Sequence, residues 1–359
     1  MTGVRQLDAL TGLRGIAAWL VVLYHIRPAL TALLPAEVIA ALAKGYLAVD
    51  LFFMLSGFVI WYNYADRLRT GGGAAVRQFL WRRLARIWPL HGAILAAYIG
   101  FVGLLAASGR SIADYPLHEL PLHLLLVQNW GFTSALAWNH PAWSISTEFA
   151  AYLLFPLLTL SGLHRLRLPG LLLVAAGLVA GIALRFLADG HAGLGADIPG
   201  LGLWRCLGGF ALGAVLCRVW QVWRFGAAWA FAAGATLLAA GLALDLPEPW
   251  LVPPVLFAGL LALVLDQGPV SRLLASRALR LLGEISYSTY LGHFLLWALW
   301  KLLFVGPSLQ LGWPGLAGFL ATVLAASIGL HRGLERPAQR WLNARQPAWA
   351  MPRRAAHPQ

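Results

Sequence analysis

Four long stretches of this chain carry no charged side chain, and they constrain its fold more than any other feature. They are Gly170–Leu184, Phe225–Leu244, Trp250–Leu265 and Leu311–Leu330. A helix that crosses the apolar part of a bilayer needs roughly 17–25 mostly apolar residues, and a soluble helix of that length shows a polar face. Charged residues make up 11% of the chain, against about 25% in soluble domains. These stretches predict an all-α polytopic integral membrane protein.

Hydropathy along the chain predicts about ten transmembrane helices and no separate soluble domain. The expected spans are 8–28, 45–63, 84–107, 142–161, 168–188, 199–217, 226–245, 250–267, 285–304 and 313–332. The apolar piece Leu117–Val127 is short and interrupted by Pro121, so we expect an interfacial or re-entrant segment there. The longest outer segment, Ala106–Pro141, is a candidate entrance for a substrate. We assign residues 1–340 to one transmembrane domain and 341–359 to a short basic cytoplasmic tail that frays along the inner leaflet.

The basic residues are concentrated in alternate loops of this arrangement. The net charge is +13, and most of the 27 lysines and arginines fall in the loops that lie on one side if the N-terminus is inside. The positive-inside rule therefore predicts an N-in, C-in topology. It also indicates that the positive charge faces a membrane surface and does not bind nucleic acid. A cleaved signal peptide is the alternative for the first segment, and it would leave nine spans. The polar groups inside that segment and the lack of a clear cleavage site favour a retained helix.

Two ionisable residues share one face of the first expected helix. Arg14 and His25 are eleven residues apart, which returns a helix to within about 20° of the same face after a rise of about 16 Å. Ionisable groups inside a bilayer are costly and usually mark a substrate or ion pathway. This pair is therefore the first candidate for chemistry.

Two carboxylates are expected at the same depth as His25. Asp50 and Glu148 each come about six residues after the outer end of their span, and His25 lies near the outer end of the first one. A carboxylate that fixes the tautomer of an imidazole and stabilises the imidazolium makes it a general base. We therefore predict a catalytic group of His25, Glu148 and Asp50. The alternative is that the three groups bond to one another only to hold helices together.

A set of arginines is expected near the inner face. Arg83 and Arg86 open the third span and are i and i+3 on one helix face, and Arg14 lies one to two turns inside. Guanidinium groups suit phosphates, although a cluster at this place is also an ordinary positive-inside boundary. The arrangement predicts a tunnel for a ligand with a phosphorylated head and a long thin arm, as in coenzyme A. Arg205, Tyr290 and His293 are weaker candidates, and Arg205 is also a candidate for neutralising a carboxylate.

Several motifs resemble those of one family. They are LDALTGLRGIAAWLVVLYH at residues 7–25, GYLAVDLFFMLSGF at 45–58, WSISTE at 143–148, GEISYSTYLGH at 283–293 and ERP at 335–337. Together, and in this order, they resemble the signatures of the membrane-bound acyltransferase-3 family, whose members include bacterial surface-glycan O-acyltransferases. The resemblance covers nearly the whole chain. Ala48 and Gly292 depart from the usual pattern, and neither is a proposed catalytic residue.

The resemblance implies a membrane-embedded O-acyltransferase of the bacterial inner membrane. Such an enzyme would move an acyl group, most often acetyl, from cytoplasmic acyl-CoA to a hydroxyl of an extracytoplasmic or lipid-linked glycan or a similar acceptor, with no metal. His25 would be the base or the acyl-accepting residue, Glu148 and Asp50 its partners, and Arg14, Arg83 and Arg86 the groups that hold the coenzyme. The alternatives are a transporter or flippase that uses the same polar groups as a proton relay and a catalytically inactive sensor.

Overall fold

A computed structural model describes residues 2–306 and 309–350, and of residues 2–7 and 348 it describes the backbone alone. This part of the chain is helical and contains no strand. The α-helices are α1 Thr2–Ile26, α2 Ala36–Ala43, α3 Ala48–Ala107, α4 Leu120–Leu125, α5 Ala142–Leu160, α6 Leu168–Ala188, α7 Ile198–Val222, α8 Ala227–Ala243, α9 Glu248–Leu265, α10 Pro269–Leu274, α11 Arg277–Glu284, α12 Ser286–Phe304, α13 Trp313–Leu330 and α14 Arg336–Ala344. Short 3-10 turns join several of them, and a π-helical turn, His331–Glu335, joins α13 to α14.

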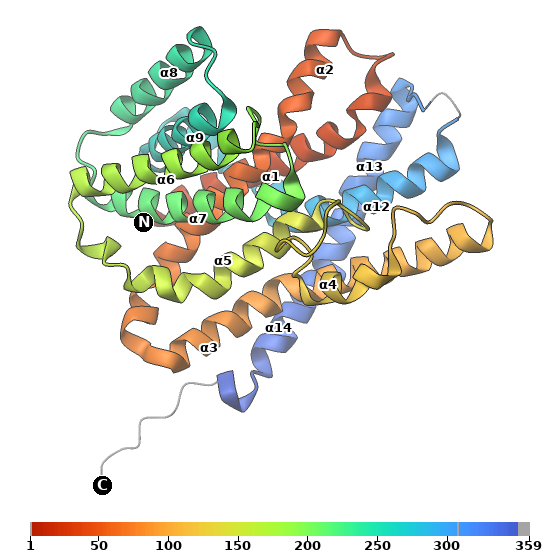
Figure 1. Cartoon of the computed structure of the whole chain (residues 1–359), viewed down its shortest axis with the longest axis horizontal. Coiled ribbons are helices and arrows are strands. Elements are labelled where there is room, and N and C mark those ends of the chain that lie inside the picture. Colours follow the sequence, from red (N-terminus) through yellow and green to blue (C-terminus); the bar gives the residue numbers. More distant parts are fainter. Residues whose placement is uncertain (1, 307–308, 351–359) are drawn as a thin grey trace.

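The long helix α3 is two helices joined at a sharp bend. Gly72 has φ 56° and ψ −156°, a backbone conformation that glycine adopts without a steric penalty and other residues avoid. The bend turns the chain back, so that the two arms of α3 run in different directions (Figure 1). The expected spans 45–63 and 84–107 lie one on each arm.

The first arm of α3 packs very closely against α7. A Cβ atom added to Gly57 would lie 1.9 Å from the carbonyl oxygen of Phe210, and one added to Gly213 would lie 2.0 Å from that of Met54. Small residues that let helix backbones approach in this way are typical of helix packing in membranes. Gly283 of α11 packs in the same way against α1, because a Cβ atom added to it would lie 1.8 Å from the carbonyl oxygen of Thr11, three residues before Arg14.

The outward faces of the helices are apolar. Leu160 of α5 is 70% exposed, Leu173 of α6 is 75% exposed and Phe231 of α8 is 69% exposed. Helices that are apolar on both their buried and their outer faces belong in a lipid environment. The chain is therefore an all-helical integral membrane protein.

Seven helical segments of the described chain are long and apolar enough to cross a membrane. One of them is residues 36–107, which contains the bend of α3, and α8 is shorter, with 17 residues. Helix α12 has 19 residues but carries Ser286, Ser288, Thr289 and His293 in its first half, and it is not one of the seven segments. The boundaries of α5, α6 and α9 agree closely with those expected. The number of ten spans and the N-in, C-in orientation stay predictions.

The segment between α3 and α5 and the C-terminal segment both pack closely against the helices. The segment after α3 folds into the short helix α4 and a loop, and Trp138 of this loop is 1% exposed. At the other end, the indole nitrogen of Trp81 donates to the carbonyl of Leu342 at 3.1 Å, and Nε of Arg77 donates to that of Trp349 at 2.5 Å. The expectation of a tail that frays after residue 341 is wrong up to residue 350, because these bonds hold it on α3. Residues 351–359 lie outside the described part.

Candidate active site

Two polar cavities lie inside the helix bundle and share part of one wall. The first, called here the arginine cavity, is lined by α1, both arms of α3, α5 and α12. The second, the histidine cavity, is lined by α1, α12, the start of α3 and the segments that lead into α5 and α7. Val49 and Tyr290 line both.

His25 lies on the wall of the histidine cavity. Its Nδ1 atom is 2.9 Å from the carbonyl oxygen of Val21, one turn earlier in α1, and 3.1 Å from Nε2 of His293 in α12. The two imidazole rings are 5.0 Å apart, and the ring of Phe294 packs edge-on against His25 at 5.1 Å. His293, a weaker candidate in the sequence analysis, is thus the direct partner of His25.

The hydrogen bonds of His293 assign the protonation of both rings. His293 is fully buried, and its Nδ1 is 2.7 Å from the carbonyl oxygen of Tyr290 and 3.1 Å from that of Thr289. Carbonyl oxygens only accept, so Nδ1 of His293 carries the hydrogen and its Nε2 is an acceptor in the neutral ring. Nδ1 of His25 must then donate, to His293 and to Val21, which leaves the lone pair of His25 on Nε2. This tautomer is the one a general base needs.

Asp50 lies beside Arg205, in a buried ion pair. Nε of Arg205 is 2.8 Å from Oδ1 of Asp50, and Nη2 is 2.6 Å from Oδ2. The side chains are 1% and 8% exposed, and this two-point geometry is the strong form of an arginine–carboxylate contact. The expectation that Arg205 neutralises a carboxylate is confirmed, and both oxygens of Asp50 are held by the guanidinium.

One hydrogen-bonding atom of Arg205 remains free. Nη2 also donates to the backbone oxygen of Tyr46 at 3.0 Å, whereas Nη1 is buried without a partner. The guanidinium lies 5.7 Å from the ring of Tyr46 and 5.5 Å from that of Trp143. Because Arg205 lines the histidine cavity, a fixed cationic donor and the imidazole of His25 face the same space. Such a donor stabilises negative charge that develops on an oxygen during a reaction.

Glu148 lies in the arginine cavity, in the company of Arg14, Arg83 and Arg86. The hydroxyl of Tyr152 lies beside its carboxylate, and Arg14 is the cation on which its charge acts. The sequence placed Glu148 at the depth of His25, but depth along a helix says nothing of rotation about its axis. Each residue turns a helix by about 100°, and the side chain of Glu148 lines the other cavity.

The three arginines of this cavity differ in their partners. Arg86 pairs with the buried carboxylate of Glu335, which also accepts from Ser288 at 2.6 Å. Nη2 of Arg83 donates to the hydroxyl of Tyr64 at 3.1 Å, and its Nε has no partner. Within the described residues, neither Arg14 nor Arg83 forms an ion pair with a carboxylate. Two cations in one cavity without a carboxylate partner make it suitable for an anionic ligand.

An open pocket beside the arginine cavity shares Arg14 and Arg86 with it. Glu335 also lines this open pocket, together with Arg336 and Gln339 of α14. On the other side, the wall towards the histidine cavity contains Tyr290, whose hydroxyl is 2.8 Å from Oγ of Ser144. The described residues contain no group of three or more His, Cys, Asp or Glu side chains that suits a metal ion.

Comparison with known proteins shows which class of membrane protein this arrangement of cavities belongs to. A family model described as an acyltransferase domain matches residues 7–332. The chain therefore belongs to the acyltransferase-3 family, and the protein is an O-acyltransferase. This membership decides for an enzyme over a transporter or an inactive sensor.

Relatives of known sequence agree with the family. The chain is 32% identical to acyltransferase MdmB of Streptomyces mycarofaciens over 97% of its own length and 96% of that protein. It is 27% identical to a putative O-acetyltransferase of Staphylococcus aureus over 43% of its length and 25% of that protein. It is 34% identical to protein 2 in the picA locus of Rhizobium radiobacter over 39% of its length and 75% of that protein. No solved structure matches the chain significantly.

Proposed function

We propose that the protein transfers an acyl group, acetyl in the simplest case, from cytoplasmic acyl-CoA to a hydroxyl of an extracytoplasmic or lipid-linked glycan in the bacterial inner membrane. The observation that carries this proposal is the pair of cavities that share Val49 and Tyr290. One cavity has cations for the donor's phosphates, and the other has a base for the acceptor's hydroxyl. A transfer between two substrates that enter separately needs such an arrangement.

The donor side is built from Arg14, Arg83 and Arg86. The nucleotide head of acyl-CoA enters at the open pocket beside Arg336, and its phosphates are bound by the arginines. The uncharged pantetheine arm follows the cavity towards Tyr290, which carries the thioester to the shared wall. Glu148 balances part of the positive charge, so that the cavity holds an anion without holding the product too strongly.

The acceptor side is built around His25. Nε2 of His25 takes the proton of the acceptor hydroxyl as its oxygen attacks the thioester carbonyl carbon. The carbon–sulfur bond then breaks, the acyl group stays on the acceptor oxygen, and the CoA thiolate takes the proton from the imidazolium of His25, which restores the base. His293 holds the tautomer of His25, and Nη1 of Arg205 stabilises the negative charge on the carbonyl oxygen. Asp50 acts through Arg205, whose guanidinium it fixes in place.

Mass spectrometry of the host's surface glycans tests this function. Cells with the gene should carry acyl groups that cells without it lack, and purified protein should release CoA thiol from acetyl-CoA only when a hydroxyl acceptor is present. Unchanged glycans together with acylation by a donor other than acyl-CoA would refute the donor and the acceptor proposed here.

A further inference from the structure

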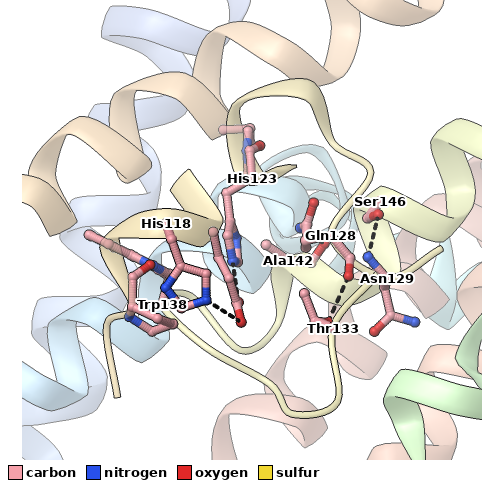
Figure 2. Close-up of polar contacts among 11 residues, drawn as sticks. His118, His123, Gln128, Asn129, Thr133, Trp138, Ala142 and Ser146 are labelled. Carbon is pink, nitrogen blue, oxygen red and sulfur yellow. Dashed lines mark hydrogen bonds and ion pairs between the residues drawn. The ribbon is translucent and has the colours of Figure 1, made fainter. Parts of the chain in front are cut away.

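A further pocket, narrower than the histidine cavity, lies beside it. It lies between α4, the loop that follows it and the start of α5, and it shares Leu136, His140 and Trp143 with the histidine cavity. Figure 2 shows the side chains of His123 and Gln128 in this region. Glu119 and Asn139 complete its polar lining. We call these four residues and the space between them the hydroxyl pocket.

Two amide side chains of this pocket have oxygens without partners. Gln128 and Asn139 are 5% and 4% exposed. Nε2 of Gln128 donates to the carbonyl of Ala142 at 3.2 Å, and Nδ2 of Asn139 donates to that of Leu291 at 2.9 Å. These bonds fix which end of each amide is nitrogen, because a carbonyl accepts only from the NH2 group. The amide oxygens of both residues are buried without a hydrogen bond.

Glu119 and His123 add to this unmet hydrogen-bonding capacity. Oε2 of Glu119 is buried without a hydrogen bond, and so are both ring nitrogens of His123, which is 3% exposed. Nε2 of His123 is 3.8 Å from Oε2 of Glu119, too long for a hydrogen bond. Neighbouring groups are satisfied: the backbone nitrogen of Asn129 donates to Oγ of Ser146, and the hydroxyl of Thr133 donates to the carbonyl of Gln128 (Figure 2).

Buried polar atoms in folded proteins nearly always have partners, so unpartnered atoms gathered at one pocket point to a ligand. We propose that the hydroxyl pocket binds one hydroxyl group of an uncharged sugar ring of the acceptor while another hydroxyl of the acceptor faces His25. This inference rests on the proposed function and names its acceptor class. The free oxygens of Gln128, Asn139 and Glu119 all accept, so they need O–H donors.

The same chemistry argues against a charged acceptor group at this position. A phosphate or a uronic acid carboxylate brings only acceptor oxygens at neutral pH, and it would face two amide oxygens and the carboxylate of Glu119. Among the unpartnered atoms of these four residues, only the ring of His123 has an N–H that could donate a hydrogen bond to such a group. The space open to a ligand is about 10 Å³ in the hydroxyl pocket, which is the room of one water-sized group, against about 230 Å³ in the histidine cavity. The wider cavity takes the ring, with the indole of Trp143 at its side, and the narrow pocket takes one of its hydroxyl groups.

Two matched sets of acceptors test this inference with the purified full-length protein and acetyl-CoA. The neutral probes are methyl α-D-glucopyranoside and methyl α-D-mannopyranoside, and the charged probes are methyl glucuronoside and glucose 1-phosphate. Transfer is followed by release of CoA thiol, and binding without donor by the thermal stabilisation that each probe gives. We expect transfer and stabilisation with a neutral probe and neither with the charged ones.

Gln128→Met and Asn139→Leu remove the free oxygens. One neutral hydrogen bond lost corresponds to roughly a three- to tenfold rise in KM, so each variant should raise the KM of the neutral glycoside by that factor and leave the KM of acetyl-CoA unchanged. Thr159→Val is the control, because it removes a buried hydrogen bond to the carbonyl of Pro156, elsewhere in α5, and should leave both KM values unchanged.

The outcomes separate this inference from the proposed function. Transfer to the charged probes in preference to the neutral ones would overturn the inference and leave the acyl-CoA reaction standing. Lower melting temperatures in both variants with an unchanged glycoside KM would also overturn it, because the pocket would then hold only structural water. If no hydroxyl acceptor supports thiol release, the proposed function fails, and thermal stabilisation by the neutral glycosides, lost in Gln128→Met, still decides on the pocket.

Discussion

The arginine cavity and the histidine cavity use the same kind of side chain in opposite ways. In the arginine cavity, Arg14 and Arg83 have no carboxylate partner among the described residues, so their charge is available to a ligand. In the histidine cavity, Arg205 is fixed by two bonds to Asp50 and offers one remaining donor atom. Free charge suits binding of a mobile anion, whereas a fixed donor suits stabilisation of charge that exists only during the reaction. Substitutions in the arginine cavity should therefore change the KM of acetyl-CoA, and substitutions in the histidine cavity should change kcat.

The largest effect is expected at His25. His25→Ala should abolish transfer, because loss of a general base lowers kcat by about a hundredfold or more. Insertion into the membrane should remain normal, since the change removes a polar group from the membrane interior. Thiol release from acetyl-CoA measures the rate. His191→Ala, which removes an imidazole outside both cavities, is the control, and transfer by His25→Ala at the rate of that control would remove His25 from the mechanism.

Arg205→Lys should have the next largest effect. Lysine keeps the positive charge beside Asp50 but has neither the two-point contact nor the free Nη1 atom. Loss of one donor to a reacting oxygen lowers kcat by roughly a hundredfold to a thousandfold, with the KM of acetyl-CoA unchanged. Single-turnover kinetics and the melting temperature are measured together. A stable variant with a normal kcat would show that the ion pair only joins α3 to α7.

His293 should act as a positioning residue for His25. His293→Leu removes one of the two acceptors of the hydrogen on Nδ1 of His25 and leaves only the carbonyl of Val21. The ring is then held less firmly in its tautomer and orientation, and kcat should fall by roughly tenfold to a hundredfold. His293→Gln offers an amide oxygen to the same hydrogen and should recover part of the rate. The pH profile of kcat should shift in the leucine variant and return towards wild type in the glutamine variant. Equal rates in the two variants would mean that His293 serves packing alone.

The sequence predicted the positions of the helices and the kinds of polar side chain in the site better than it predicted which side chains contact one another. The uncharged stretches predicted α6 and α9 because burial in lipid demands an apolar run whatever the tertiary contacts are. Arg14, Arg83 and Arg86 were predicted to lie together, and the arginine cavity contains all three. The partners of His25 and Asp50 were not predictable from depth, because contact between helices depends on their rotation and tilt.

The bend at Gly72 and the ring of His293 show the same limit of prediction from a single sequence. Gly72 is one of three consecutive glycines, and nothing in the sequence indicates how the two arms of α3 on either side of them pack. His293 stood in a motif that the sequence analysis quoted, but the contact that fixes its ring is a hydrogen bond to the backbone oxygen of Tyr290. Hydrogen bonds to backbone atoms of another turn or helix leave no pattern in a single sequence, so they become visible only in the structure.

The arginine cavity should respond through KM. Arg14→Gln and Arg83→Gln each remove a cation that forms no ion pair with a carboxylate of the described residues, and a charge-assisted contact to a phosphate is worth about 1.5–3 kcal/mol. Each change should raise the KM of acetyl-CoA by roughly tenfold or more, and saturating donor should restore most of kcat. Donor titrations check this. Arg82→Gln, on the same turn of α3 but outside the cavity lining, is the control, and unchanged KM values in both test variants would refute the phosphate site.

The smallest effect, and the one whose sign separates the two cavities, is expected for Glu148→Gln. If Glu148 stabilised the imidazolium of His25, as its depth suggested, the change would lower kcat and extra donor would not help. In the structure Glu148 lies among the arginines, where its negative charge opposes that of an incoming phosphate. Glutamine keeps the shape and removes this repulsion, so the KM of acetyl-CoA should fall by about two- to fivefold at low salt, and the difference should shrink as salt screens the charges. Because product CoA carries the same phosphates, its inhibition constant should fall in parallel. A lower kcat with an unchanged KM would return Glu148 to the side of His25 and break the division between the cavities.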